Sequence, residues 1–273
     1  ANRSTPSVST VVLTTAGGLT HVGENIVPTG LEPKVLALAP LSGDLIMGSR
    51  APVTPQLSRW TRNIATGALN SQPGLAMAAG ARIRGLATAA QHQRIYSANF
   101  LGGDISAIGV TPLVVASSQN SVTSPLGVAI GSSEKYLYVV GDQIGEIMMH
   151  DIDAAGDVGP MVQRLPVAAG PSGVVGSVDE RSLYTYNYAA GSISAFNLSA
   201  ATGQVSTLAE YPVGGNATGI AIDEGAQYVA ATSSANAAVI VLQRNLLTGE
   251  LTERQRFAVC SSGVPTSVSM ITA

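Results

Sequence analysis

Short apolar segments recur along the chain, and each one is bounded by turn residues. In the clearest copy, Gly127–Ile130 is followed by polar turn residues and then by the tyrosine-rich segment Tyr136–Val140. The same order recurs at Gly173 and at Gly219. Short runs of this kind, separated by Gly, Pro, Ser and Asp, are typical of β-strands joined by tight turns. The pattern therefore predicts an all-β chain.

The strand pairs repeat at a nearly constant spacing. The equivalent positions, which include weaker copies near each end, are Val35, Gly85, Gly127, Gly173, Gly219 and Ser267. They lie roughly 42 to 50 residues apart, which is the length of a four-stranded propeller blade. Each unit has room for two further strands, and several units carry a Thr-Gly turn in which glycine supplies a positive φ. We expect a β-propeller with about six blades of four antiparallel strands; the rungs of a parallel β-helix, the alternative fold, are much shorter.

The two ends of the chain together supply nearly one more blade. Strands at Val8–Thr14 and Leu19–Val27 are expected to pair with a C-terminal strand at Pro265–Thr272. This pairing would close the ring and remove exposed sheet edges. We therefore predict a single propeller domain over 1–273, and we leave open whether its closing blade lacks one strand. The closing blade combines 7–30 with 264–273, and the other blades span approximately 31–80, 81–123, 124–170, 171–215 and 216–263.

Composition narrows the class of function. Charged residues make up 11% of the chain, the formal net charge is −3, and no block of like charge occurs. The basic stripe of a nucleic-acid-binding protein is therefore absent from the sequence, and no apolar segment is long enough to span a membrane. The single cysteine, Cys260, cannot form an internal disulfide. We expect neither nucleic acid nor a membrane as a partner, and a protein partner is left open.

The compartment is also left open. The chain begins at Ala1, and Asn-x-Ser/Thr triplets begin at Asn2, Asn197 and Asn216. These features are compatible with a processed and secreted protein. A cytoplasmic location is the alternative.

From about Ser124 to its end, the chain resembles the lactonase-type propellers, the family that contains 6-phosphogluconolactonase and fungal carboxymuconate cyclases. The resemblance is carried by the segments SSEKYLYVVGDQIGEIMMHDID and DERSLYTYNYAAGSISAFNLSAATGQV, and by the tail that begins at Ala238. It implies a lactonase-like hydrolase or cyclase of carbohydrate metabolism that acts on a small anionic sugar lactone or carboxylate. Members of the family usually have seven blades, whereas this chain accounts for about six.

The sequence departs from this family at the residues that carry its chemistry. Hydrolytic members typically have Pro-Arg-His at the start of an inner strand, whereas this chain has Pro125-Leu126-Gly127 and Pro171-Ser172-Gly173. The family's acid–base histidines therefore cannot be transferred to this chain. Whether the chain is an enzyme stays open, and the alternative is a non-catalytic propeller, secreted or surface-exposed, that binds a protein or glycan.

Candidate site residues follow from the expected topology. The links between blades and the turns after the second strands should lie on one face of the ring, where loops on a rigid scaffold commonly carry function. Arg and Lys suit a carboxylate or phosphate ligand, and Arg82 and Arg84, two residues apart on a strand, are expected to share one face. Asp142 and Glu146 are the candidates for a general base. The predicted substrate-binding residues are Lys34, Arg50, Arg82, Arg84, Asn99, Asn187 and Asn236.

Other chemistry finds little support in the sequence. The three histidines lack the spacing of a metal site, and neither a nucleophile elbow nor a Gly-rich phosphate loop occurs. We therefore expect no metal and no cofactor. His150 is interpreted as the solvated end of a third strand, and Trp60 is expected to pack within its blade.

Overall fold

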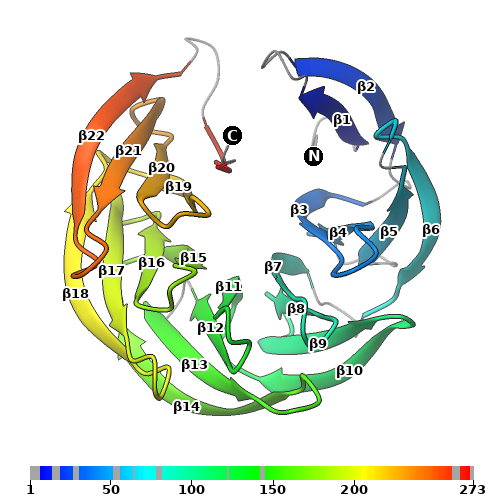
Figure 1. Cartoon of the computed structure of the whole chain (residues 1–273), viewed down its shortest axis with the longest axis horizontal. Coiled ribbons are helices and arrows are strands. Elements are labelled where there is room, and N and C mark those ends of the chain that lie inside the picture. Colours follow the sequence, from blue (N-terminus) through cyan, green and yellow to red (C-terminus); the bar gives the residue numbers. More distant parts are fainter. Residues whose placement is uncertain are drawn as a thin grey trace. The chain divides into compact units, whose positions relative to one another are not determined.

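The computed structural model describes residues 7–13, 19–26, 31–51, 56–63, 65–77, 82–121, 123–141, 145–259 and 265–270. These residues form two compact units, Ala1–Asn120 (unit 1) and Ser121–Ala273 (unit 2). They contain five four-stranded antiparallel sheets and one two-stranded sheet. The predicted all-β class and the four-stranded blade are confirmed (Figure 1). The number of blades is not: the described residues complete five blades, because the N-terminal segment supplies only a hairpin.

Unit 1 consists of this hairpin and two blades. The hairpin pairs β1 (Ser7–Leu13) with β2 (Leu19–Ile26), and Val8 packs against Met47 and Trp60 of the first blade. Trp60 is 3% exposed, which confirms its predicted role in packing. The strands of the two blades are β3 (Pro33–Leu38), β4 (Leu45–Ser49), β5 (Leu57–Arg62), β6 (Leu69–Leu75), β7 (Ile83–Ala89), β8 (Arg94–Asn99), β9 (Asp104–Val110) and β10 (Leu113–Asn120).

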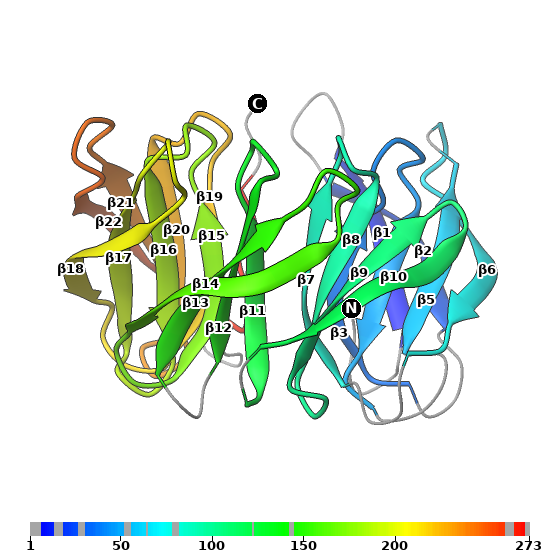
Figure 2. The ribbon, with the colours of Figure 1, turned by 90° about the horizontal axis from the view of Figure 1, so that it is seen from below.

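Unit 2 contains three blades, and strand order in each follows the chain. Their first strands β11, β15 and β19 lie next to one another, and their fourth strands β14, β18 and β22 lie on the outside of the unit (Figure 1). Figure 2 shows the strong twist from β11 to β14, as expected for a sheet of twisted strands. The strands are β11 (Pro125–Ile130), β12 (Tyr136–Gly141), β13 (Glu146–Ile152), β14 (Val158–Pro166), β15 (Pro171–Gly176), β16 (Ser182–Asn187), β17 (Ser192–Leu198), β18 (Val205–Pro212), β19 (Ala217–Ile222), β20 (Tyr228–Ser233), β21 (Ala238–Arg244) and β22 (Leu251–Ala258).

Two repeated contacts hold neighbouring blades of unit 2 together. The Tyr138 hydroxyl donates to the carbonyl oxygen of Gly203 at 2.9 Å, and the Tyr184 hydroxyl donates to that of Gly249 at 2.6 Å. In each pair a buried tyrosine of a second strand reaches the Thr-Gly turn of the next blade. The tyrosines and the Thr-Gly turns that marked the repeat in the sequence therefore form the same hydrogen bond between each pair of neighbouring blades in unit 2.

Glycine allows the first strands to approach closely. A Cβ atom built on Gly127 would lie 2.6 Å from the Cα atom of Gly173 in the next blade. At the end of the chain, a Cβ atom on Gly219 would lie 2.8 Å from the Cα atom of Ser267, and the Thr218 hydroxyl donates to the Pro265 carbonyl at 2.6 Å. Segment 265–270 therefore lies beside β19 much as β15 lies beside β11.

Candidate functional site

Each blade has an irregularity at the same place in its first strand. The pairing register between the first and second strands shifts by one residue, so that one residue of the first strand is left without a partner. Such a β-bulge turns a side chain away from the regular alternation and is common next to functional sites. The residues at the five bulges are Lys34, Arg84, Leu126, Ser172 and Thr218.

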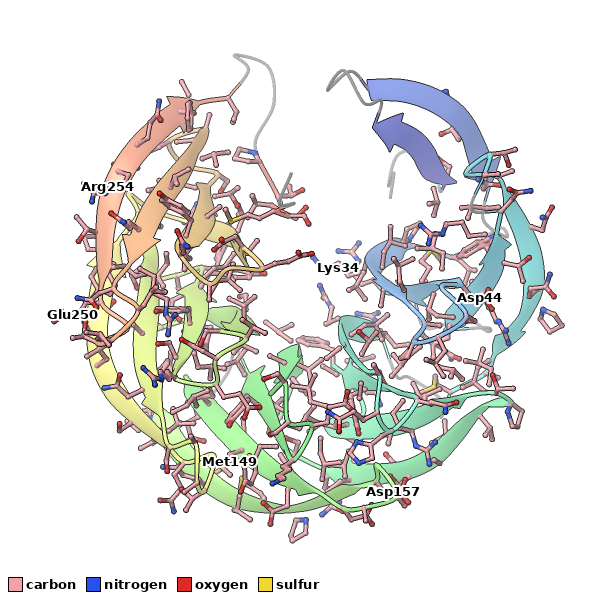
Figure 3. All side chains as sticks on the ribbon, viewed as in Figure 1. Lys34, Asp44, Met149, Asp157, Glu250 and Arg254 are labelled. Atoms are coloured by element: carbon pink, nitrogen blue, oxygen red, sulfur yellow. The ribbon has the colours of Figure 1, made fainter. Side chains whose placement is uncertain are left out.

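The two bulges of unit 1 carry cations. Lys34 on β3 is exposed, and it extends away from the outer strands β5 and β6 of its blade (Figure 3). Arg84 lies at the equivalent position of β7, and β3 and β7 contact each other. The guanidinium carbon of Arg84 is 4.8 Å from the centroid of the Phe100 ring, which is the geometry of a cation–π interaction. Two adjacent strands thus present a positive side chain at the same step of their ladders.

Arg82 comes just before β7 and differs from its predicted placement. Its φ is +26°, which lies outside the extended region, and the bulge at Arg84 follows directly. The alternation rule holds only for regular extended residues, so it does not apply to Arg82 and Arg84, and their shared face stays a prediction. The Nε atom of Arg82 is buried and has no hydrogen-bond partner among the described residues.

Arg50, another predicted substrate-binding residue, forms an ion pair within unit 1. Its Nε atom donates to Glu32 Oε2 at 2.7 Å, and the Arg50 amide donates to the Glu32 carbonyl at 2.8 Å. The side chain is thereby tied to the residue that precedes β3. Sequence reasoning did not identify Glu32 as this partner, although the acid occupies the position equivalent to Arg82.

Asn99 and Asn187 occupy matching positions in two blades, and both are buried within hydrogen-bond networks. The amide nitrogen of Asn99 donates to Asp104 at 3.0 Å and to Ser106 at 2.9 Å, while its oxygen accepts from the Ser97 hydroxyl.

Asn187 repeats this arrangement in unit 2. It donates to Ser194 at 2.8 Å and to Ser192 at 3.2 Å, and it accepts from the Thr185 hydroxyl. Both donors and the acceptor of each amide are engaged within the blade. These networks hold the turn between the second and third strands.

The remaining predicted residues lie in unit 2. Glu146 begins β13, and its Oε2 atom is 3.2 Å from the Nη2 atom of Arg164 on β14. In the neighbouring blade the equivalent residue is Ser192, a member of the Asn187 network. Asn236 lies in an exposed turn, and Asp142 lies outside the described residues. The predicted site residues are thus divided between the two units, and their binding and catalytic roles stay predictions.

His150 differs from its interpretation as a solvated strand end. It lies on β13 and is fully buried. Its Nδ1 atom is 3.1 Å from the Gly159 carbonyl, and its Nε2 atom is 3.1 Å from the Ser121 hydroxyl. Burial lowers the pKa of His150 below its ordinary value of 6.5, more than the Gly159 hydrogen bond and the Asp151 charge raise it. The interpretation from sequence was wrong because Asp151 and Asp153, which follow His150, suggested a solvated strand end.

Neither metal ligation nor a membrane-spanning helix can be found in the part of the chain that the structure describes. No group of three or more His, Cys, Asp or Glu side chains there could hold a metal ion. No helix of the described residues is long and apolar enough to cross a membrane.

Comparison with solved structures shows the same fold in bacterial proteins. A candidate 6-phosphogluconolactonase of Bacteroides uniformis has 18% identity and a TM-score of 0.78, covering 94% of this chain and 80% of its own. A candidate 6-phosphogluconolactonase of Bacteroides fragilis has 14% identity and a TM-score of 0.80, covering 96% and 79%. The periplasmic gluconolactonase of Pseudomonas aeruginosa has 14% identity and a TM-score of 0.80, covering 93% and 77%. At these identities the likeness establishes the fold alone.

Comparison by sequence identifies the family. No curated protein matches the chain in sequence. The family model described as "Lactonase, 7-bladed beta-propeller" matches residues 130–270, which is about half of the chain and begins close to where the lactonase-like segments begin. The match, the four-stranded blades and the solved structures agree. The chain therefore belongs to the lactonase β-propeller family.

Proposed function

We propose that this lactonase-type propeller binds a small anionic sugar lactone, or its open carboxylate, through Lys34 and Arg84. The observation that supports the proposal is the repeated bulge, which presents a cation at the same step of two adjacent first strands. The equivalent bulges of unit 2 carry Leu126, Ser172 and Thr218, so cations occupy this bulge position only in unit 1. A carboxylate or phosphate gains charge-assisted hydrogen bonds from such a pair.

Phe100 gives Arg84 a defined orientation in this proposal. The guanidinium carbon lies over the Phe100 ring at 4.8 Å, and the N–H groups of a guanidinium lie in its own plane. An anion is therefore bound at the edge of the guanidinium, where two parallel hydrogen bonds can form. Lys34, a flexible point charge, adds attraction without fixing a geometry.

Hydrolysis of a lactone would require two further contributions. Water adds to the ring carbonyl, the ring C–O bond breaks, and the product is a hydroxy acid. A general base takes the proton of the water, and a positive or hydrogen-bonding group stabilises the oxyanion. Asp142 and Glu146 remain the proposed candidates for the base. Glu146 forms an ion pair with Arg164, and it would have to take up the proton of the water while in this pair.

Binding and turnover of charged and neutral ligands test the proposal. We expect Lys34→Gln and Arg84→Gln each to weaken binding of 6-phosphogluconate by about 10- to 100-fold, since a hydrogen bond to a charged group contributes about 1.5–3 kcal/mol. Calorimetry measures the affinity, and hydrolysis is followed with glucono-1,5-lactone and its 6-phosphate. Arg62→Gln is the matched control, because Arg62 is exposed at the end of β5.

The outcomes separate the candidate functions. Binding of the anion without hydrolysis of either lactone would remove the catalytic part and leave a binding propeller. Equal affinity of wild type and both variants for 6-phosphogluconate, or no binding by wild type, would refute the anion site. Unchanged behaviour of Arg62→Gln shows that the losses do not arise from net charge alone.

The closed ring is part of the same proposal. It is supported by the position of segment 265–270 beside β19 in unit 2, and by Leu36 and Leu38 of β3, which are 38% and 49% exposed in unit 1. Deletion of residues 265–273 should reduce hydrogen-exchange protection of the β1 and β2 amides if these strands complete one sheet. Unchanged protection after the deletion would refute closure through the chain ends.

A further inference from the structure

A residue with positive φ precedes the first strand in four of the five blades. The φ values are +26° at Arg82, +60° at Ser124, +75° at Gly170 and +40° at Asn216. In three of these blades the residue accepts the same backbone hydrogen bond that Glu32 accepts from Arg50 in the first blade. The amides of Phe100, Tyr188 and Ser234 donate to the carbonyls of Arg82, Gly170 and Asn216 at 3.1, 2.7 and 3.0 Å. The positive φ is therefore a property of the blade and not of Arg82 itself.

Arginine is a costly residue at such a position. Glycine has no Cβ atom and adopts positive φ readily, and asparagine tolerates it through short-range hydrogen bonds of its side chain. An arginine side chain offers neither relief. Strain of this kind persists where the surrounding structure enforces it, and it occurs preferentially at binding sites.

No hydrogen bond of the Arg82 Nε atom offsets the backbone strain at this position. Two arginines with buried or half-buried side chains have carboxylate partners: Arg59 donates to Asp44 at 2.7 Å, and Arg244 donates to Asp179 at 2.9 Å. The exposed Arg62 and Arg181 are accessible to water. The Nε atom of Arg82, like those of Arg84 and Arg94, is buried and has no hydrogen-bond partner among the described residues. The buried donor group of Arg82 therefore has no acceptor among the described residues.

We infer that Arg82 is a ligand-binding residue held in a strained backbone conformation, and that an anionic ligand supplies the acceptor for its buried N–H group. The inference rests on the proposed anion site of Arg84, which lies two residues away. It predicts that Arg82 lowers the stability of the free protein and increases that of the complex. A purely structural arginine would stabilise the free protein instead.

Thermal unfolding with and without ligand tests the inference. Arg82→Gly should raise the Tm of the ligand-free protein by about 2–4 °C, because the strain and the unpaired donor both disappear. The same variant should bind 6-phosphogluconate about tenfold or more weakly, measured by calorimetry. Asn216→Gly is the matched control, since it removes a side chain at the equivalent position of unit 2 and should leave the affinity unchanged.

Three results would overturn the inference. A fall in Tm for ligand-free Arg82→Gly would show that the side chain stabilises the fold. Wild-type affinity in Arg82→Gly, together with loss of affinity in Arg84→Gln, would remove Arg82 from the site and leave the proposed function intact. Absence of binding by the wild-type protein would overturn both. A further variant, Arg82→Asn, tolerates positive φ without the cation, and it should lose affinity as the glycine variant does.

Discussion

The contact between Arg244 and Asp179 is the ion pair of unit 2 whose loss should be most visible. Arg244 ends β21, and its side chain is 0% exposed. Its Nη2 atom donates to both carboxylate oxygens of Asp179, at 3.0 and 2.9 Å, and its Nη1 atom donates to the Ala226 carbonyl at 3.1 Å. Asp179 lies in the turn between β15 and β16, so the pair joins two adjacent blades.

Replacement of Asp179 by Asn leaves a buried guanidinium without its counter-charge. Breaking a buried pair in this way costs about 3–5 kcal/mol. Because the Asp179 side chain is 33% exposed, water can reach the vacated place, and we expect the lower end of this range, about 3 kcal/mol. For a unit of this size that corresponds to a fall in Tm of about 6–12 °C.

Urea unfolding followed by circular dichroism measures this loss, because the only tryptophan, Trp60, lies in unit 1. The double variant Asp179→Ala with Arg244→Leu should recover part of the stability, since replacement of a buried ion pair by apolar groups is often neutral. Arg254→Leu, on the exposed strand β22, is the control. A loss below about 0.5 kcal/mol in Asp179→Asn would refute the reasoning.

The pH dependence of the same pair gives a second readout. Burial alone would raise the pKa of Asp179, but hydrogen bonds from Ser177 and Arg244 and the charge of Arg244 outweigh it and hold the pKa below 3.8. The folded pKa is thus lower than the unfolded one. The pair contributes its full stability above about pH 4 and loses it as the pH falls through the folded pKa. In Asp179→Asn, the free energy of unfolding should depend less on pH in this acidic range.

Three further predictions concern packing and protonation. Burial lowers the folded pKa of His150, so stability should fall as the pH drops below 6.5, and thermal unfolding of His150→Gln should show a weaker dependence between pH 7 and 5; an unchanged slope would contradict this. Tyr138→Phe and Tyr184→Phe should each cost about 1 kcal/mol in urea unfolding, because an interblade hydrogen bond is lost, whereas the exposed Tyr228→Phe should cost nothing. Gly127→Ala should cost about 3 kcal/mol, because its Cβ atom would meet the Gly173 backbone, whereas nothing lies within 4 Å of a Cβ atom on Gly23; equal stability of the two alanine variants would refute the close approach.

Local chemistry in the sequence was sufficient to predict the blade. Strand alternation, the Thr-Gly turns and the tyrosine-rich second strands depend on residues close in the chain, and they repeat with one period. The cationic positions Lys34 and Arg84 were found in the same way, because they stand at one step of the repeat. The family resemblance, read from the segments after Ser124, agrees with the match over 130–270.

Tertiary structure decided what each polar side chain does. Asn99 and Asn187 are engaged in networks that join three strands of a blade, and His150 is buried by contacts with Gly159 and Ser121. The bulge at Arg84 and the positive φ of Arg82 interrupt the regular alternation on which the sequence-based expectation depended. These features depend on which strands pair and in what register, and residues distant in the chain determine that pairing. A single sequence therefore determined the blade and its repeat, whereas burial, partner and strain at each candidate residue arose only from packing.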